Sequence, residues 1–290
     1  MAHAENSYYV PHGSHWPIVG SIGVCTLFVG FANLLNGVSW GTPVMVVGFA
    51  ITIFMMFGWF GTVIRENERG IYNMQVDMSF RWGMFWFIFS EVMFFAAFFG
   101  ALFYARVYSI PWLSGDGIGM STNEFLWQGF EGSWPENANG PGNIGGDYEL
   151  IPAWGLPAIN TALLLTSGVT LTWAHHALKA KHRGQLILGM ILTIALGATF
   201  MVIQGYEYIH AYMDLGLTLG SGIYGTTFFM LTGFHGLHVT IGAIILTVIL
   251  LRIIAGHFTP ERHFAFEAAA WYWHFVDVVW LGLFIFVYML

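Results

Sequence analysis

Long apolar runs alternate with short polar segments along most of the chain. A helix needs roughly 20 apolar residues to cross a bilayer. Runs that meet or approach this length lie near residues 17–36, 42–64, 82–106, 155–178, 185–209, 224–251 and 264–289. The pattern predicts an all-α integral membrane protein with seven transmembrane helices.

The polar segments divide the chain further. Residues 1–16 are expected to form a cytoplasmic N-terminal tail, which lacks Lys and Arg and so differs from a signal peptide. Residues 17–107 hold the first three helices and residues 154–290 the last four. Between them, residues 108–153 form an outer loop without Lys or Arg. Its acidic residues are Asp116, Glu124, Glu131, Glu136, Asp147 and Glu149.

A loop of this length is usually either functional or poorly ordered. It can be an acidic flap over the outer ends of the helices. Alternatively, it is a contact surface for a partner subunit or a basic electron-carrier protein.

Composition supports the membrane class. The chain is 57% hydrophobic and 9% charged, whereas soluble domains carry about 25% charged residues. The single cysteine, Cys25, excludes an internal disulfide and a cysteine metal cluster.

The nine basic residues predict the orientation. With a cytoplasmic N-terminus, eight of them lie on the inner side and only Arg106 lies outside. The eight are Arg65, Arg69, Arg81, Lys179, Lys181, Arg183, Arg252 and Arg262. This bias follows the positive-inside rule and places the C-terminus outside.

The last run contains FEAAAWYWHFVDVVWL, residues 266–281. Glu267, His274 and Asp277 fall on one side of a helix because they are spaced by seven and three residues. Charged groups at membrane depth persist only when they are paired or face protein. This side is therefore expected to face protein.

Glu91 lies ten residues after Arg81, hence roughly 15 Å deeper along a helix. Desolvation at that depth favours the neutral acid. Two roles fit: a group that relays protons or contacts a ligand, and a protonated carboxyl that donates a hydrogen bond between helices.

Other polar residues also lie in or near the predicted spans. His235 and His238 are three residues apart and His175 and His176 are adjacent, so haem or copper ligation competes with hydrogen bonding between helices. Gln204, Glu207 and His210 resemble an interfacial polar belt, with a transport site as the alternative. Five residues lie towards the inner ends of the predicted spans: Trp59, Arg65, Glu66, Arg81 and Arg252. Arginines at this level either bind anionic lipid or only determine the topology.

Five separated blocks resemble the subunit III family of the haem–copper oxidases. They are FEAAAWYWHFVDVVWL (266–281), TSGVTLTWAHH (166–176), GTTFFMLTGFHGLHV (225–239), QGYEY (204–208) and RWGMFWFIFSEVMFF (81–95). SHWP (14–17) is similar to the family's N-terminal SPWP. The resemblance covers nearly the whole chain.

The resemblance implies two helices plus five around a V-shaped cleft that holds phospholipids. It also implies that haem and copper lie in partner subunits, so this chain binds no metal and catalyses nothing alone. As an accessory subunit of a proton-pumping cytochrome c oxidase, it supports core stability and proton uptake. Expected partners are oxidase subunit I, which makes the main contact, subunit II, membrane phospholipids and, through the complex, cytochrome c. Nucleic acid is not expected.

Individual residues are carried over from the same resemblance. Glu91 corresponds to a buried carboxylate at the interface with subunit I. Lipid-binding positions correspond to Trp59, Arg65, Glu66, Arg81 and Arg252. Glu267, His274 and Asp277 are expected to form a structural polar stripe. The expected location is the bacterial plasma membrane, with the mitochondrial inner membrane as the alternative.

The chain departs from the family's pattern in two segments. WPENANG (134–140) replaces a frequent WPPxG in a longer outer loop, and ENERGIYNMQVDMSF (66–80) lacks the common His-Thr-Pro. Two rival functions remain. A quinol oxidase counterpart usually has five spans, and a stand-alone transporter would use Glu91 and Glu207 as coupling carboxylates.

Overall fold

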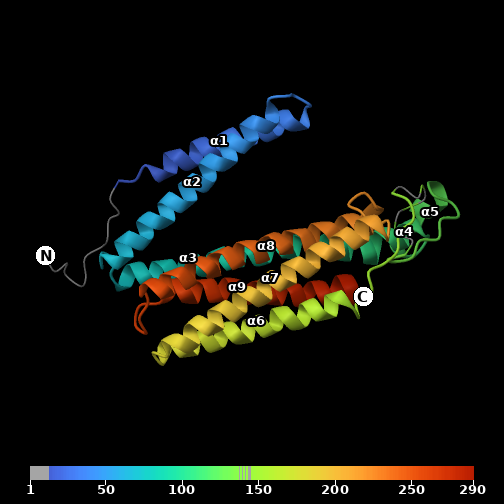
Figure 1. Cartoon of the computed structure of the whole chain (residues 1–290). Helices are drawn as coiled ribbons and strands as arrows, with labels where there is room; N and C mark the ends of the chain where they lie inside the picture. Colours follow the sequence, from blue (N-terminus) through green and yellow to red (C-terminus); the bar gives the residue numbers. More distant parts are fainter. Residues whose placement is uncertain (1–12, 137, 139, 141, 143–144) are drawn as a thin grey trace. The chain divides into compact units, whose positions relative to one another are not determined.

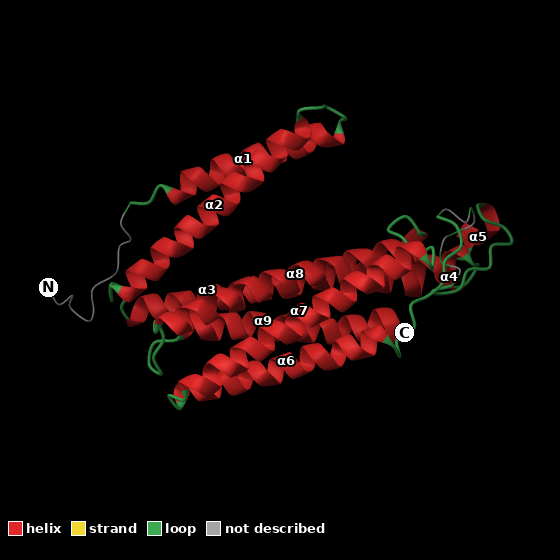
Figure 2. Ribbon diagram, in the orientation of Figure 1, coloured by secondary structure: helices red, strands yellow, loops and turns green. Residues whose placement is uncertain are grey.

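The computed structural model describes residues 13–136, 138, 140, 142 and 145–290. Residues 1–12, most of the expected N-terminal tail, lie outside the described residues. The described part is helical and contains no strand (Figures 1 and 2). Its α-helices are α1 (Trp16–Leu35), α2 (Gly41–Glu68), α3 (Met74–Tyr104), α4 (Ile110–Leu113), α5 (Ser121–Phe125), α6 (Leu156–Lys179), α7 (Arg183–Met213), α8 (Gly222–Ala255) and α9 (Phe264–Leu283).

Six helical segments of the described chain are long and apolar enough to cross a membrane. They are α1, α2, the continuous segment Met74–Leu113, α7, α8 and Phe264–Met289. The seventh expected span coincides with α6, which has a suitable length of 24 residues. Its sequence carries Asn, Thr and two His, which lower its hydropathy, so the count of seven remains a prediction.

The structure corrects the bounds of the third span. α3 begins at Met74, eight residues before the expected start, because polar side chains stabilise its first turns. Asn73 Oδ1 accepts a hydrogen bond from the Val76 amide at 3.0 Å, and Arg81 Nε lies 2.8 Å from Asp77 Oδ2. At the other end, a π-helical turn (Ala105–Ser109) and α4 extend the segment to Leu113.

By its contacts the chain forms two units, residues 1–82 and 83–290, which divide within α3. The first unit contains the antiparallel pair of α1 and α2. Glycines bring their backbones together: a Cβ at Gly48 would lie 2.2 Å from Leu27 N, and one at Gly30 would lie 2.1 Å from Met45 N. Such close approach is typical of helices packed in membranes. The expected arrangement of two plus five helices and its cleft remain predictions.

The second unit has its core among α6, α7, α8 and α9, which lie side by side in Figures 1 and 2. The most apolar stretch of the segment Phe264–Met289, which contains α9, is 61% buried, whereas the corresponding stretches of α7 and α8 are each 33% buried. Indole hydrogen bonds fix α9 to α6. Trp273 Nε1 donates to Ser167 Oγ at 2.8 Å, and Trp280 Nε1 donates to Thr161 Oγ1 at 2.9 Å.

The end of the outer loop is packed against the second unit. The Glu149 amide donates to the Leu215 carbonyl at 2.9 Å, and the Tyr148 ring stacks on Tyr224 with centroids 5.8 Å apart. Tyr148 also donates a hydrogen bond to the Pro135 carbonyl, and burial raises its pKa to about 12. All six acidic side chains of the loop are nevertheless exposed. The described loop thus combines an anchored segment with an acidic surface.

Candidate functional site

Glu91 on α3 meets His238 on α8. The Glu91 carboxylate Oε2 lies 2.9 Å from His238 Nε2, and both side chains are largely buried, with 20% and 11% exposure. Phe95 packs against the imidazole at 5.0 Å between centroids, and Tyr272 of α9 stacks near it at 6.4 Å. This surrounding apolar surface limits water access and strengthens the polar contact.

The hydrogen bonds of His238 restrict where its protons lie. Its Nδ1 is 2.6 Å from the Phe234 carbonyl oxygen, which only accepts, so Nδ1 carries a proton. One further proton then lies between Nε2 and Glu91. Either a protonated Glu91 donates to a neutral imidazole, or an imidazolium donates to a carboxylate. The structure therefore brings together a buried acid and base that share one proton, and sequence reasoning had not paired them.

The polar stripe of α9 divides into two groups, both of which meet α6. At the start of α9, Glu267 Oε1 lies 3.1 Å from His263 Nε2 and 3.8 Å from His175 Nε2 of α6. Further along, His274 Nδ1 lies 3.3 Å from Asp277 Oδ2, and His274 Nε2 lies 3.4 Å from Thr172 Oγ1 of α6. Glu267 and Asp277 thus face protein of their own unit, whereas the side chain of His274 is 44% exposed. The purely structural role of the stripe remains a prediction.

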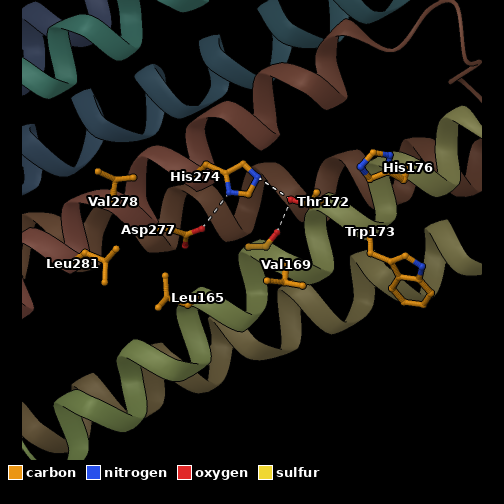
Figure 3. Close-up of a pocket in the computed structure, with 10 residues that line it drawn as sticks. Leu165, Val169, Thr172, Trp173, His176, His274, Asp277, Val278 and Leu281 are labelled. Atoms are coloured by element: carbon orange, nitrogen blue, oxygen red, sulfur yellow. Dashed lines mark hydrogen bonds and ion pairs between the residues drawn. The ribbon is translucent and has the colours of Figure 1, made fainter.

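The second of these groups lies beside a shallow groove between α6 and α9, with a volume of about 600 Å³ (Figure 3). The apolar residues that line it are Leu165, Val169, Trp173, Val278 and Leu281. Thr172 donates to the Gly168 carbonyl at 2.9 Å, so its oxygen accepts from His274. Thr172, His274 and Asp277 therefore form a chain of hydrogen bonds along the groove.

His235 and His238 do not converge on a common ligand. His235 is buried and its Nε2 donates to the Val276 carbonyl of α9 at 3.2 Å, while His238 faces α3. The His235 ring also lies 5.1 Å from the Trp280 ring. These two histidines connect helices. Their positions do not form the paired metal ligands that the sequence left open.

The expected polar belt at the end of α7 is only partly correct. His210 pairs with Asp214 at 2.7 Å near the surface, as expected of an interfacial belt. Glu207 and Gln204 are instead buried, with 0% and 4% exposure. Tyr288 donates a hydrogen bond to Glu207 Oε1 at 2.5 Å. Because Tyr288 lies 81 residues away, no local sequence pattern could have shown this pairing.

The expected lipid-binding residues lie in both units. Trp59, Arg65, Glu66 and Arg81 belong to the first unit and Arg252 to the second. Arg65 is exposed and donates to the Gly61 carbonyl at 3.1 Å, while Tyr72 donates to Glu66 Oε2 at 2.6 Å. Arg252 is buried, with its guanidinium 4.6 Å from the centre of the Phe258 ring. The convergence of these residues on one cleft remains a prediction.

Comparison with known proteins extends the resemblance to the whole chain. A family model for cytochrome c oxidase subunit III matches residues 6–116 and 141–290. The unmatched residues between these ranges lie in the outer loop, where the sequence departs from the family pattern. Proteins named cytochrome c oxidase subunit 3 from Gadus morhua, Drosophila melanogaster and Pongo abelii are 41%, 40% and 40% identical to the chain. Each alignment covers 99% of this chain and 97% or 98% of the relative.

Proposed function

Because this chain belongs to the cytochrome c oxidase subunit III family, we propose that it is a non-catalytic accessory subunit of a proton-pumping terminal oxidase. The complex would reduce oxygen to water with electrons from cytochrome c. Haem and copper would lie in the partner subunits, and this chain would supply binding surface, lipid sites and support for proton uptake. The observation that carries the proposal is the family match along both units of the chain.

The proposed main contact with subunit I is the outward face of α3 around Glu91. Large apolar side chains flank the acid and are exposed, including Phe89 at 47% and Met93 at 55%. An exposed surface of large apolar side chains is typical of contact with lipid or with another protein. Beside it, the partly buried acid and its shared proton give this face chemistry that a purely lipid-facing surface does not need.

The proposed support for proton uptake rests on the Glu91–His238 pair. A group that holds one proton between an acid and a base can bind or release that proton with little rearrangement. Its position in α3 would let it influence protonatable groups in subunit I across the interface. Removing the subunit would then slow proton uptake and shorten the working life of the oxidase.

The proposed lipid sites use the guanidinium groups of Arg65, Arg81 and Arg252 for phosphate, with Trp59 and Glu66 near them. Arginine is well suited to phosphate because its planar donors match the phosphate oxygens. The inner ends of helices are also where basic residues meet anionic headgroups. This places the proposed headgroups on the inner side, with the N-terminus inside and the C-terminus outside.

The chain is a multi-pass membrane protein by its helices. The relatives named above come from a fish, an insect and an ape, which supports the mitochondrial inner membrane, the alternative location. The bacterial plasma membrane remains a prediction that these relatives do not test. Both locations place the chain in a membrane that carries an aerobic respiratory chain.

Purification of the native complex tests the main proposal. We expect the chain to co-purify with haem, visible in the absorption spectrum. The oxidase depleted of this chain should take up protons more slowly and lose activity sooner during turnover. A haemless chain with substrate-dependent proton flux would instead support the transporter. Unchanged pumping and survival after depletion would refute the support of proton uptake.

The lipid proposal has a separate test. Changing Arg65→Ala together with Arg252→Ala should reduce the phospholipid that co-purifies with the complex, as measured by mass spectrometry. Arg106→Ala is the matched control, because this arginine lies near the opposite end of a helix and should not affect inner lipids. Equal lipid counts in all three proteins would refute the assignment.

A further inference from the structure

Three side chains with metal-ligating atoms meet where α6 ends and α9 begins. His175 lies four residues before the last residue of α6, and His263 immediately precedes α9. Glu267 lies one helical turn after His263, so the two face the same direction. One ligand atom from each of the three lies within 4.8 Å of the other two. Among the described residues, this is the only group of three or more His, Cys, Asp or Glu with such a geometry.

The distances fit a tetrahedral ion. Zinc binds imidazole nitrogen and carboxylate oxygen at about 2.0–2.2 Å, so neighbouring ligand atoms in a tetrahedral site are about 3.3–3.6 Å apart. The two separations from Glu267 Oε1 are 3.1 Å to His263 Nε2 and 3.8 Å to His175 Nε2. These values lie just below and just above that range. Small side-chain rotations would therefore place the three atoms around one ion.

The imidazoles also lack hydrogen bonds that an ion would replace. Neither His175 Nε2 nor His263 Nε2 has a hydrogen-bond partner, although both face Glu267. His263 is more than nine-tenths buried, with 8% exposure, and is directed into the group. Buried polar atoms without partners are rare in folded proteins and often mark a missing water or ion.

We propose that His175, His263 and Glu267 bind a divalent transition-metal ion, with zinc as the best fit. Two imidazoles and one carboxylate select zinc over magnesium or calcium, which prefer sets of oxygen ligands. The three protein ligands leave a fourth position for water. The ion would connect the end of α6 to the start of α9 and hold the segment before α9 in place. This site goes beyond the proposed function and departs from the expectation that the chain binds no metal.

The environment sets the expected strength of binding. Lys179 lies one turn after His175, so its positive charge opposes a cation there, although its exposure lets solvent screen part of this effect. The carboxylate of Glu267 offsets part of the charge of the ion directly. Both histidines must be neutral to bind, so zinc should bind more weakly as the solution becomes acidic.

Zinc binding to the intact purified oxidase complex tests the proposal. Bound metal is first removed with a chelator, and radioactive zinc is then titrated by equilibrium dialysis. Relative to the wild type, His175→Gln, His263→Gln and Glu267→Gln should each remove one zinc per complex or weaken it at least tenfold. His176→Gln is the matched control, because this neighbouring histidine is exposed and lies outside the group. X-ray absorption spectroscopy of the wild-type complex should show that the zinc ion absent from the variants is bound by two imidazole nitrogens.

Equal zinc binding by the wild type and all three variants would overturn the proposal. If a variant does not assemble, a measurement on the wild type alone decides. Anomalous scattering from zinc-treated wild-type complex should give a peak among the three side chains. The lack of a peak there at saturating zinc would also overturn the assignment. Either result leaves the proposed oxidase function unaffected, because that function depends on co-purification with haem.

Discussion

Replacement of Glu91 by glutamine should be mild if Glu91 and His238 form a neutral pair. In such a pair the acid donates its proton to His238 Nε2 at 2.9 Å, while Nδ1 donates to Phe234. The glutamine amide can donate to Nε2 in the same position. Glu91→Leu, in contrast, removes the donor and leaves the Nε2 of a largely buried imidazole without a partner.

The two pairings differ in the expected cost of the glutamine change. A hydrogen bond between neutral groups contributes about 0.5–1.5 kcal/mol, and one that involves a charged group about 1.5–3 kcal/mol. Because glutamine retains a neutral bond, Glu91→Gln should cost less than about 1 kcal/mol for the neutral pair. If the native pair is ionic, Glu91→Gln should lower the stability by about 1.5–3 kcal/mol. Glu91→Leu should lower it by about 1–3 kcal/mol, because it leaves the imidazole nitrogen unsatisfied.

Heat-induced release of the chain from the purified oxidase measures these differences. Wild type, Glu91→Gln and Glu91→Leu are compared in one detergent by the temperature at which half of the chain has dissociated. Infrared spectroscopy adds a direct readout, because a protonated carboxyl has a carbonyl band that should disappear in Glu91→Gln. If glutamine destabilises the chain as much as leucine does and no such band is lost, the neutral pair is wrong.

Three further changes test the packing. Gly48→Val should separate α1 from α2, because a Cβ there would lie 2.2 Å from Leu27 N. Gly61→Ala in the same helix is the control, because no atom lies within 4 Å of the new Cβ, and it should be neutral or stabilising. The sensitivity of the α1–α2 pair to protease distinguishes the Gly48→Val variant from this control. Trp273→Phe should cost about 1–3 kcal/mol, since it removes a buried hydrogen bond to Ser167 and leaves a cavity. Trp271→Phe is the control, because Trp271 is partly exposed. Thermal unfolding is followed by near-ultraviolet circular dichroism, and equal melting temperatures of the two variants would contradict the packing described. Tyr288→Phe should lower the melting temperature by removing the partner of buried Glu207, whereas an unchanged temperature would show that this bond contributes nothing.

The helices were predictable because their signal is local. Each of the seven apolar runs coincides with a helix to within a few residues at most ends, although the count of seven membrane spans remains a prediction. The largest departures, at the two ends of α3, have identifiable causes. Asn73 and Asp77 extend α3 backward through side-chain contacts that hydropathy does not register. A π-helical turn extends it forward past Tyr104. Such ends depend on individual hydrogen bonds, so hydropathy alone locates them poorly.

The candidate site was predictable only in part. The alignment of Glu267, His274 and Asp277 on α9 followed from helical spacing, whereas the depth of Glu91 in the membrane remains a prediction. The partners did not, because they come from distant segments: Glu91 meets His238 at a separation of 147 residues, and His274 meets Thr172 at a separation of 102 residues. His263 and Glu267 are one helical turn apart in the sequence, and this spacing is the one local signal of their pairing.

The class of this protein, its helices and its family can be predicted from the order of its residues, since hydrophobicity and motif order are local features of the chain. Which polar groups meet is known only from the packing of the helices. It paired Glu91 with His238, buried Glu207 against Tyr288, and brought His175 to His263 and Glu267. The physical reason is that apolar packing is weakly specific, whereas a buried polar group needs a particular partner at a particular distance. That partner is fixed by how helices pack, which no single segment of the chain encodes.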